Sequence, residues 1–285
     1  MADPLFSVSG RTALITGASS GIGFYIAKGL AEHNCAPVYI VGRRAEALQR
    51  AASVAPNVII PLVGNVSTKE GCVRIAEAFA KTERGRGVVD VALDILVNNA
   101  GVMMKEGWWN DSGASAEDVR DALLKLEDDE WSHEFAINAS SVQWLSAALL
   151  PYLVRAAKHN DGFRQGRGTV INNTSVSALY VSSAAKGHLY SASKAAAESL
   201  TKNLASKFTK MGVRVNSIAP ANIPSEMNDP ETPGSFISLR RHAIPIGRIG
   251  NEEDVVGAVL YLASRAGSYV SGTTIKLDGG LLVGV

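Results

Sequence analysis

The chain has 285 residues, a length that fits one large α/β domain or two small ones. Hydrophobic residues make up 46% of the chain and charged residues 19%, a balance that provides a buried core and excludes intrinsic disorder. The formal net charge is +1, so no excess of basic side chains predicts binding to nucleic acid or to an anionic membrane.

Cysteine and histidine usage exclude several further classes. The two cysteines, Cys35 and Cys72, are too few for a disulfide scaffold and form no CxxC pair, so we expect reduced thiols. The five histidines form neither an HxH nor an HExxH pattern, and we expect no catalytic metal. The chain begins without a signal-peptide pattern and has no run near the roughly 20 apolar residues of a membrane helix. These features predict a cytoplasmic protein without a membrane segment.

The first strong pattern is a short apolar run at residues 12–16, followed by a cluster of three glycines. A buried strand that enters a tight turn fits this pattern. Apolar residues then repeat every four positions from Ile22 to Leu30, as on the buried face of a helix. The chain is therefore predicted to open with a strand, a glycine turn and a helix.

Strands and helices alternate along the rest of the chain. Short apolar runs predict strands at residues 38–41, 58–63, 94–97, 169–172, 213–218 and 274–277. Amphipathic segments predict helices at residues 45–52, 71–81, 131–150, 189–211 and 252–264. This alternation is typical of parallel strands joined by crossover helices, and no linker or repeat divides it. We therefore predict that residues 1–285 form a single doubly wound, Rossmann-type α/β domain, with helices on both faces of one parallel sheet.

Two stretches depart from the alternation. Residues 103–130 contain Trp108, Trp109 and an acidic run, and residues 220–248 contain five of the ten prolines. Long irregular connections in this architecture usually shape a site. We expect the first stretch to be an insert near the substrate entrance, with a surface cluster as the alternative, and the second to be a substrate lid.

The glycine turn suggests a nucleotide site, because the carboxyl edge of a parallel sheet brings backbone N–H groups and a helix N-terminus toward phosphate. The turn between Thr16 and Gly23 reads TGASSGIG, which differs from the GxGxxG fingerprint. The second predicted strand ends at Arg43 and Arg44 instead of at an acid. A guanidinium pairs with the 2′-phosphate of NADP(H), whereas an acid would bind the 2′-hydroxyl of NAD(H), so the sequence favours NADP(H). Solvated arginines at a helix start are the alternative.

Tyr190 and Lys194 lie four residues apart on a predicted helix, so the phenol and the ammonium share one face. A nearby positive charge stabilises a phenolate and is expected to lower the pKa of the phenol from about 10 toward neutrality. Such a tyrosine can exchange a proton with a substrate oxygen. Ser175 and Ser177 follow the fifth predicted strand, and either hydroxyl could hydrogen-bond a carbonyl oxygen. The alternative is that both serines only form a turn.

From residue 10 to residue 280 the chain resembles the short-chain dehydrogenase/reductase family. The family's motifs occur in order: the glycine turn, Asn98-Asn-Ala-Gly101, Asn138, a serine after the fifth strand, Tyr190-x-x-x-Lys194, Asn216-x-x-x-Pro220 and Asp278-Gly-Gly280. The segment after Pro220 and the Asp-Gly-Gly ending are most similar to 3-oxoacyl (acyl-carrier-protein) reductases, including the type of rhamnolipid synthesis.

The resemblance implies hydride transfer between NADP(H) and a carbonyl compound. Tyr190 would be the general acid, and Lys194 would lower its pKa and hold the nicotinamide ribose. Ser175 would polarise the carbonyl and Asn138 would position a water molecule. Ser175 fits the family's serine corner, whereas Ser177 gives the more usual interval to the tyrosine, so Ser177 remains its rival. The cofactor-binding residues that the resemblance implies are Gly17, Ser19, Ser20, Gly21, Ile22, Gly23, Arg43, Arg44, Asn65, Val66, Asn99, Ala100, Gly101, Tyr190, Lys194, Pro220, Ile223 and Ser225.

Three positions depart from the family pattern. Ala221 stands where the family has glycine, so the cofactor geometry is expected to be slightly altered. Ser225 replaces the usual threonine, and Asn65 replaces an aspartate that binds adenine. An amide can still hydrogen-bond the adenine amino group, so this last change is expected to be tolerated.

The sequence thus predicts an NADPH-dependent reductase that converts a ketone to a secondary alcohol on an acyl, polyketide-like or other secondary-metabolite substrate. One alternative is non-redox use of the same site by an isomerase, dehydratase or cyclase, for which Ala221 and the tryptophan-bearing insert are the motivation. Another is an NADP(H)-responsive binding protein. The expected partner is a small-molecule carbonyl compound.

Two features bear on larger partners. Arg155, Lys158, Arg164 and Arg167 could meet an acidic acyl-carrier protein, with a solvated loop as the alternative. The resemblance implies a homotetramer, with a homodimer as the alternative. The apolar residues 281–285 could then be buried at a subunit contact.

Overall fold

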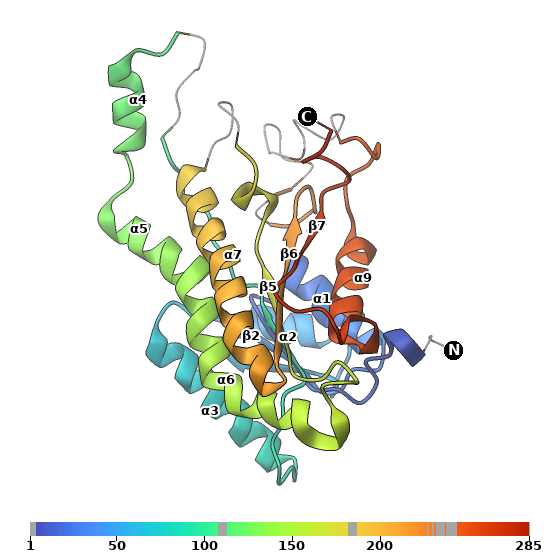
Figure 1. The fold of residues 1–285 in the computed structure, drawn as a ribbon. Coiled ribbons are helices and arrows are strands. Elements are labelled where there is room, and N and C mark those ends of the chain that lie inside the picture. Colours follow the sequence, from blue (N-terminus) through green and yellow to red (C-terminus); the bar gives the residue numbers. More distant parts are fainter. Residues whose placement is uncertain are drawn as a thin grey trace.

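The structure is a computed structural model that describes residues 4–107, 113–181, 187–226, 228, 229, 231, 237 and 244–284. Within these residues, seven parallel strands form one sheet in the order β3-β2-β1-β4-β5-β6-β7 (Figure 1). The strands are β1 Ala13–Thr16, β2 Val38–Gly42, β3 Ile59–Val63, β4 Ile95–Asn98, β5 Thr169–Asn173, β6 Arg214–Pro220 and β7 Thr274–Leu277. The doubly wound parallel sheet predicted from the sequence is therefore confirmed.

Helices connect the strands. The α-helices are α1 Gly21–Glu32, α2 Ala45–Ala52, α3 Lys69–Gly85, α4 Ala116–Leu123, α5 Asp128–Phe135, α6 Ser141–Lys158, α7 His188–Phe208 and α9 Glu252–Ala263. Short 3₁₀ turns occupy Pro4–Phe6, His159–Asp161, Val176–Ala178, Thr209–Met211 and Arg265–Gly267. The bounds of α2 and β7 agree with the prediction at both ends, and the other predicted elements differ mainly at their ends.

One predicted helix was wrong as a single element. Residues 131–150 were expected to form one helix, but a π-helical turn at Ala136–Ser140 divides the segment into α5 and α6. The apolar repeat continues through the π turn, so periodicity does not reveal it. Another difference is at β6, which continues to Pro220, two residues past the predicted end, where Pro220 pairs with Leu277.

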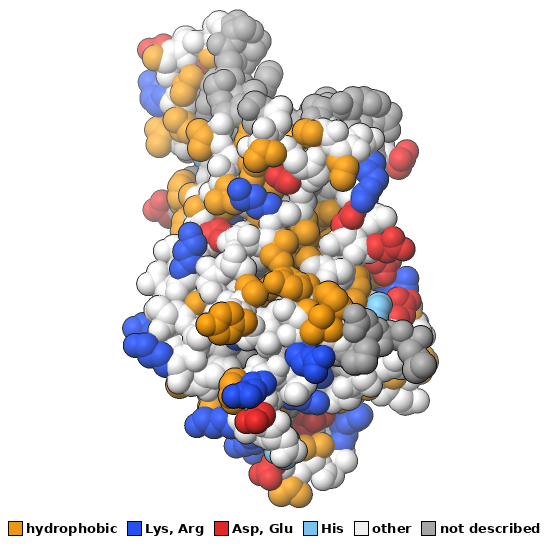
Figure 2. Space-filling view, turned by 45° about the vertical axis from the view of Figure 1, so that its right-hand side comes forward, with side chains coloured by type: hydrophobic (Ala, Val, Ile, Leu, Met, Phe, Trp, Pro, Cys, Tyr) orange, Lys and Arg blue, Asp and Glu red, His pale blue; other side chains and the backbone are white. Residues whose placement is uncertain are grey.

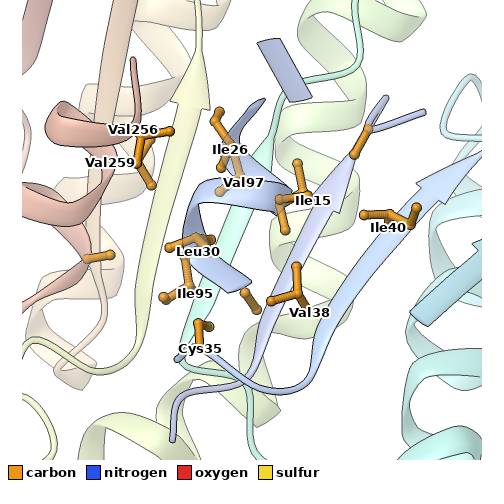
Figure 3. Close-up of a cluster of buried hydrophobic side chains, with 14 of the residues drawn as sticks. Ile15, Ile26, Leu30, Cys35, Val38, Ile40, Ile95, Val97, Val256 and Val259 are labelled. Atoms are coloured by element: carbon orange, nitrogen blue, oxygen red, sulfur yellow. The ribbon is translucent and has the colours of Figure 1, made fainter. Parts of the chain in front are cut away.

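Two layers of helices cover the sheet. Helices α1, α2 and α9 pack on one face, and α3, α6 and α7 pack on the other. Side chains of β1 alternate between these layers, because Ile15 joins the first cluster and its neighbour Leu14 joins the second. Figure 3 shows Ile15 and Ile26 pointing into the first cluster together with Val259 of α9. Each such buried side chain contributes about 1.5–3 kcal/mol to stability.

The insert at residues 103–130, which the sequence set apart from the alternation of strands and helices, is only partly irregular. It contains α4 and the start of α5. Helix α4 begins with a capping box, because the Ser115 hydroxyl accepts the N–H of Asp118 at 3.1 Å and the carboxylate of Asp118 accepts the N–H of Ser115 at 2.9 Å. Trp108 and Trp109 lie outside the described residues.

Helix α4 projects from the body of the domain (Figure 1). None of its residues is buried, and Leu123 is exposed at its end, as is Leu124 beyond it. Figure 2 shows hydrophobic side chains exposed on this projecting helix, which we call the arm. The arm therefore contributes little to the core.

Three further observations concern the thiols, membrane spans and the end of the chain. Cys35 and Cys72 are free and buried. No helix in the described part of the chain is long and apolar enough to cross a membrane. Leu281 is buried within its own chain, and Val283 is exposed. Leu281 is therefore not available for the subunit contact that its apolar character suggested, because it already packs inside the fold.

The packing of α1 against α9 predicts the effect of adding one methyl group. A Cβ at Gly29 would lie 2.5 Å from Cγ2 of Val256, so Gly29→Ala is expected to destabilise the protein by about 1–3 kcal/mol through overpacking. Urea unfolding measures the change. In α9 itself, a Cβ at Gly257 meets nothing within 4 Å, so Gly257→Ala should instead stabilise by about 0.5–1 kcal/mol. Equal effects of the two substitutions would contradict the described contact.

Candidate active site

The sheet order places β1 next to β4, so the glycine turn after β1 meets the Asn-Asn-Ala-Gly segment after β4. The side-chain nitrogen Nδ2 of Asn99 donates to the carbonyl oxygens of Thr16 at 2.8 Å and Gly17 at 3.1 Å. In return, Oγ1 of Thr16 accepts the N–H groups of Asn99 and Ala100, each at 3.0 Å. These four hydrogen bonds hold the two carboxyl-end loops together.

The turn needs glycine at two positions because the backbone adopts a positive φ and neighbouring atoms lie close. Gly17 has a φ of +64°, and a Cβ there would lie 2.8 Å from Cα of Ala100. Gly21 has a φ of +55°, and a Cβ there would lie 3.0 Å from Cβ of Ser225. Ser225 thus brings the segment after β6 against the glycine turn.

Helix α1 begins in this turn with its first backbone N–H groups uncapped by a side chain. Its N-cap residue is Ser20, whose side chain makes no capping hydrogen bond. An uncapped helix N-terminus combines free N–H donors with the positive end of the helix dipole, which suits an anion such as phosphate. The other predicted cofactor residues lie along the same edge of the sheet: Ser19 in the turn, Ile22 and Gly23 in α1, Val66 after β3, Gly101 after β4 and Ile223 after β6.

Two arginines follow β2, as predicted, but their surroundings differ. Arg44 forms an exposed ion pair with Glu226 at 3.5 Å. Arg43 is also exposed, and no described residue forms an ion pair with it. Asn65 follows β3 and is exposed, with its Oδ1 accepting the N–H of Ser67 at 3.0 Å. Of the two arginines, Arg43 is therefore the one without an ion pair among the described residues.

Tyr190 and Lys194 occupy one face of α7, one turn apart. The ammonium nitrogen of Lys194 lies 5.6 Å from the centroid of the Tyr190 ring and donates to the carbonyl oxygen of Asn173 at 2.8 Å. Lys194 is only 3% exposed. Burial lowers the pKa of Lys194 to about 8, while the nearby carboxylates of Glu134 and Glu198 raise it.

In this structure the pKa of Tyr190 moves away from neutrality, opposite to the direction expected from Lys194 alone. Burial raises the pKa of Tyr190 to about 12, a hydrogen bond with Ser175 lowers it, and the charge of Glu134 raises it further. The ammonium lies over the ring and donates to a backbone carbonyl, and it is not among the groups that shift the pKa of the phenol. The phenol therefore keeps its proton at neutral pH.

Of the two candidate serines, Ser175 is the one that influences the pKa of Tyr190, which it lowers. Ser175 is buried, and its Oγ accepts the N–H of Ser177 at 3.1 Å. Its hydroxyl thus begins the 3₁₀ turn at Val176–Ala178. Ser177 is partly exposed.

Asn138 lies in the π turn and is almost fully buried. Its Oδ1 accepts the N–H of Val102 at 2.9 Å, and its Nδ2 donates to the carbonyl oxygen of Val102 at 2.8 Å. The same Nδ2 donates to Oγ of Ser193 at 2.9 Å. The amide therefore joins the loop after β4 to α7.

Four residues near this site were not singled out from the sequence. Glu134 is a fully buried acid one turn before Asn138, at an i, i+4 spacing that could have revealed it. Glu106 caps α7, because its carboxylate accepts the N–H groups of His188 at 2.7 Å and Leu189 at 2.6 Å. The other two are Glu198, in the helix of the YxxxK pair, and Asn222, next to the Asn-x-x-x-Pro motif.

Glu198 and Asn222 differ in how their polar atoms are satisfied. Glu198 accepts hydrogen bonds from Ser217 at 3.1 Å, from Thr274 at 2.6 Å and from Thr174, so it joins α7 to three segments of the sheet. Asn222 is only 3% exposed, yet neither its Nδ2 nor its Oδ1 has a hydrogen-bond partner among the described residues. Such an amide suits a bound polar group.

The basic residues considered for a carrier protein do not lie at this site. They end α6 or precede β5, so the parallel topology puts them at the amino edge of the sheet, opposite the glycine turn. Arg167 forms an ion pair with Asp94 at 2.8 Å, and Arg155 donates to the carbonyl oxygen of Val91. This group therefore gives no support to docking of an acyl carrier beside Tyr190.

The profile of one protein family, described as enoyl-(acyl carrier protein) reductase, matches residues 17–282. The chain is 35% identical to a short-chain dehydrogenase/reductase, PhomF, of Diaporthe leptostromiformis, over 99% of this chain and 94% of that protein. It is also 35% identical to the rhamnolipids biosynthesis 3-oxoacyl-[acyl-carrier-protein] reductase of Pseudomonas aeruginosa, over 97% of this chain and 98% of that protein. A solved RhlG/NADP active-site complex from Pseudomonas aeruginosa is similar in structure, with a TM-score of 0.79, 31% identity, and coverage of 98% and 99% of the two chains.

The buried ammonium predicts a pH dependence of stability. The pKa of Lys194 is about 8 in the folded protein against 10.5 for an ordinary lysine, so between these values the unfolded chain binds more protons and stability rises with pH. At about 1.4 kcal/mol per pKa unit, the gain is about 3 kcal/mol. Lys194→Met removes this contribution.

Urea unfolding of both proteins between about pH 7 and pH 10 measures the effect. The stability difference between the wild type and Lys194→Met should move in favour of the wild type as the pH rises. Taking the difference cancels groups that titrate in both proteins. Parallel pH profiles would contradict the burial of a charged lysine.

Proposed function

This chain belongs to the short-chain dehydrogenase/reductase family of oxidoreductases, and we propose that it uses NADPH to reduce a ketone to a secondary alcohol. The observation that carries the proposal is the meeting of Tyr190, Ser175 and Lys194 at the carboxyl edge of the sheet, beside the glycine turn. A hydroxyl donor, a protonated phenol and a buried ammonium are the groups that carbonyl reduction requires.

The residues at this edge fit a dinucleotide. The uncapped start of α1, in the glycine turn, offers backbone N–H donors to a pyrophosphate. Arg43 would pair with a 2′-phosphate, which supports NADP(H) over NAD(H). Asn222, with both polar atoms of its buried amide unpartnered among the described residues, fits a polar group of the cofactor near Ile223. Bound NADPH would supply the hydride.

The protein's own groups would then manage the oxygen and the proton. Ser175 would hydrogen-bond the carbonyl oxygen of the substrate, and Tyr190 would protonate that oxygen as negative charge develops on it. A phenol with a raised pKa is protonated at neutral pH, which is the form that reduction needs. Lys194 would stabilise the phenolate that remains and bind the ribose hydroxyls. Asn138 would position a water molecule that returns the proton.

The proposed substrates are ketones on acyl, polyketide-like or other secondary-metabolite skeletons. Support comes from the relatives, one of which is described as a 3-oxoacyl-[acyl-carrier-protein] reductase of rhamnolipid biosynthesis. The insert with α4 and the segment after β6 would select among such ketones.

Removal of the phenolic hydroxyl provides the first test. Tyr190→Phe is expected to lower the rate of NADPH oxidation with β-keto esters and aromatic ketones by about 10²–10⁴-fold, because the general acid is lost. NADPH absorbance measures the rate, and quenching of protein fluorescence measures cofactor binding. Binding should change by less than about threefold.

Two serine variants form a matched pair for the same assay. Ser175→Ala should lower kcat by about 10²-fold, whereas Ser177→Ala should lower it by less than about threefold. The reverse order would assign the carbonyl contact to Ser177. If the wild type formed product without stoichiometric loss of NADPH, the proposal of a reductase would give way to that of a non-redox enzyme. If Tyr190→Phe left the biological effect unchanged, it would give way to that of a binding protein.

The two arginines after β2 provide a test of the preference for NADPH over NADH. Arg43→Ala is expected to raise KM for NADPH by about 10–100-fold and to leave KM for NADH unchanged, because a bidentate contact to the 2′-phosphate is lost. Arg44→Ala should have a smaller effect, since Arg44 is already paired with Glu226.

Arg50→Ala is the matched control, because this exposed arginine lies in the last turn of α2, the helix that follows Arg43. A loss of NADPH affinity that is equal in Arg43→Ala and Arg50→Ala would indicate a general charge effect and would overturn the assignment of the 2′-phosphate site.

A further inference from the structure

A buried acid that the proposed chemistry does not use lies next to the site. Glu134 belongs to the last turn of α5 and is 0% exposed. It follows a run of exposed acidic residues at the start of the same helix. Carboxylates are rarely buried so completely unless specific partners hold them.

The partners of Glu134 come from three separate segments of the site. Its Oε2 accepts the N–H of Met104, in the loop after β4, at 2.7 Å. Its Oε1 accepts Nδ2 of Asn138 in the π turn at 3.3 Å, and Oγ of Ser193 in α7 at 3.4 Å. One carboxylate therefore connects the loop, the π turn and the helix that carries Tyr190 and Lys194.

These contacts favour the ionised form of the acid. The N–H of Met104 is the unshared donor, and an ionised carboxylate is purely an acceptor. The contacts to Oε1 are longer because Ser193 also donates to the carbonyl oxygen of Tyr190 at 2.8 Å, and Nδ2 of Asn138 also donates to Val102 and Ser193. Burial is the largest influence and leaves the pKa of Glu134 raised overall, and the charge of Glu106 adds to this. The backbone hydrogen bond from Met104, Ser193 and the positive charge of Lys194 in α7 lower the pKa against that effect.

The negative charge of Glu134 shifts the pKa values of both Lys194 and Tyr190. Glu134 raises the pKa of Lys194 against the effect of burial, and it raises the pKa of Tyr190. Glu198 also acts on Lys194, from within α7, but it is not among the groups that influence Tyr190. Glu134 is thus the described carboxylate that acts on both members of the pair.

We propose that Glu134 is a positioning residue of this site: its two carboxylate oxygens hold Asn138 and the loop at Met104 in place beside the helix that carries Tyr190 and Lys194. The inference rests on these contacts for the positioning and on the proposed function for its effect on catalysis, and the influence of its charge on Lys194 provides a readout. A purely structural acid would stabilise the fold without changing the titration of Lys194.

The sign of the effect follows from electrostatics. Without the negative charge, a buried ammonium loses its proton at lower pH and a phenol ionises at lower pH. Reduction needs a protonated phenol and a charged lysine, so its alkaline limit should move to lower pH. Oxidation of the alcohol needs the phenolate, so its acidic limit should also move to lower pH.

The first experiment titrates Lys194 directly and requires no substrate. Protein labelled with ¹³C at lysine Cε is titrated by NMR, and the Lys194 resonance is assigned from its absence in Lys194→Met. In Glu134→Gln the midpoint should fall by about 0.5–1 pH unit relative to the wild type. Glu134→Asp keeps the charge with a shorter reach and should restore at least half of the shift.

A matched control separates charge from burial. Glu83 of α3 is another buried acid, 3% exposed, and it accepts a hydrogen bond from Tyr39 of β2. Strand β2 lies near one end of the sheet, whereas α7 contacts β6 near the other end. Glu83→Gln removes a buried charge at comparable risk to stability but should leave the Lys194 midpoint unchanged. An unchanged midpoint in Glu134→Gln, or an equal shift in Glu83→Gln, would overturn the proposal.

The second experiment concerns catalysis. In Glu134→Gln, kcat/KM for ketone reduction at neutral pH should fall about tenfold, and the limits of both pH profiles should move downward together by about 0.5–1 unit. A wild type that leaves NADPH unconsumed with every ketone would count against the proposed function while the NMR midpoint still decides the role of Glu134. An active Glu134→Gln with unshifted profiles would count against Glu134 alone.

Discussion

The site depends on the burial of one ammonium group. Lys194 is almost completely enclosed, and an unpaired charge in such surroundings would be strongly unfavourable. Three groups offset this: the carbonyl oxygen of Asn173 at the end of β5, and the carboxylates of Glu134 and Glu198. Because these groups belong to different elements, the charge is accommodated only when α5, β5 and α7 are all in place. The stability of this region therefore depends on the same contacts that arrange the site.

Helix α7 is fixed to the sheet by polar contacts at the level of the site. Tyr190, Lys194 and Glu198 recur every four residues on one face of the helix. Glu198 reaches Ser217 of β6 and Thr274 of β7, whereas apolar residues of the same helix pack into the core beneath. Apolar packing tolerates small shifts, but hydrogen bonds to a carboxylate are directional. The phenol is therefore held at a defined height along the edge of the sheet.

Much of the fold could be predicted from the sequence because each strand is a short apolar run between turn signals. The sheet order could not be read directly, but parallel alternation alone already placed the loops after Thr16, Asn98 and Asn173 at one edge. The division of the segment before Asn138 escaped prediction. A π turn adds a residue without interrupting the apolar pattern, so no period in the sequence marks it.

The same π turn explains why Glu134 was missed. Several acids precede it in α5, and which of them faces inward depends on the phase of the helix relative to the π turn. The pKa of Tyr190 was misjudged for a related reason. Spacing reveals that Lys194 is near, but burial, which decides the direction of the shift, exists only in the folded protein.

The arm formed by α4 has a consequence for how this protein can change over evolutionary time. Because α4 buries none of its residues, mutations there can accumulate with little penalty to folding. Before α4, however, the carboxylate of Glu106 accepts hydrogen bonds from the first N–H groups of α7, so substitutions at Glu106 affect the helix that bears Tyr190. During evolution the residues of α4 can therefore be replaced while Tyr190 and Lys194 keep their positions.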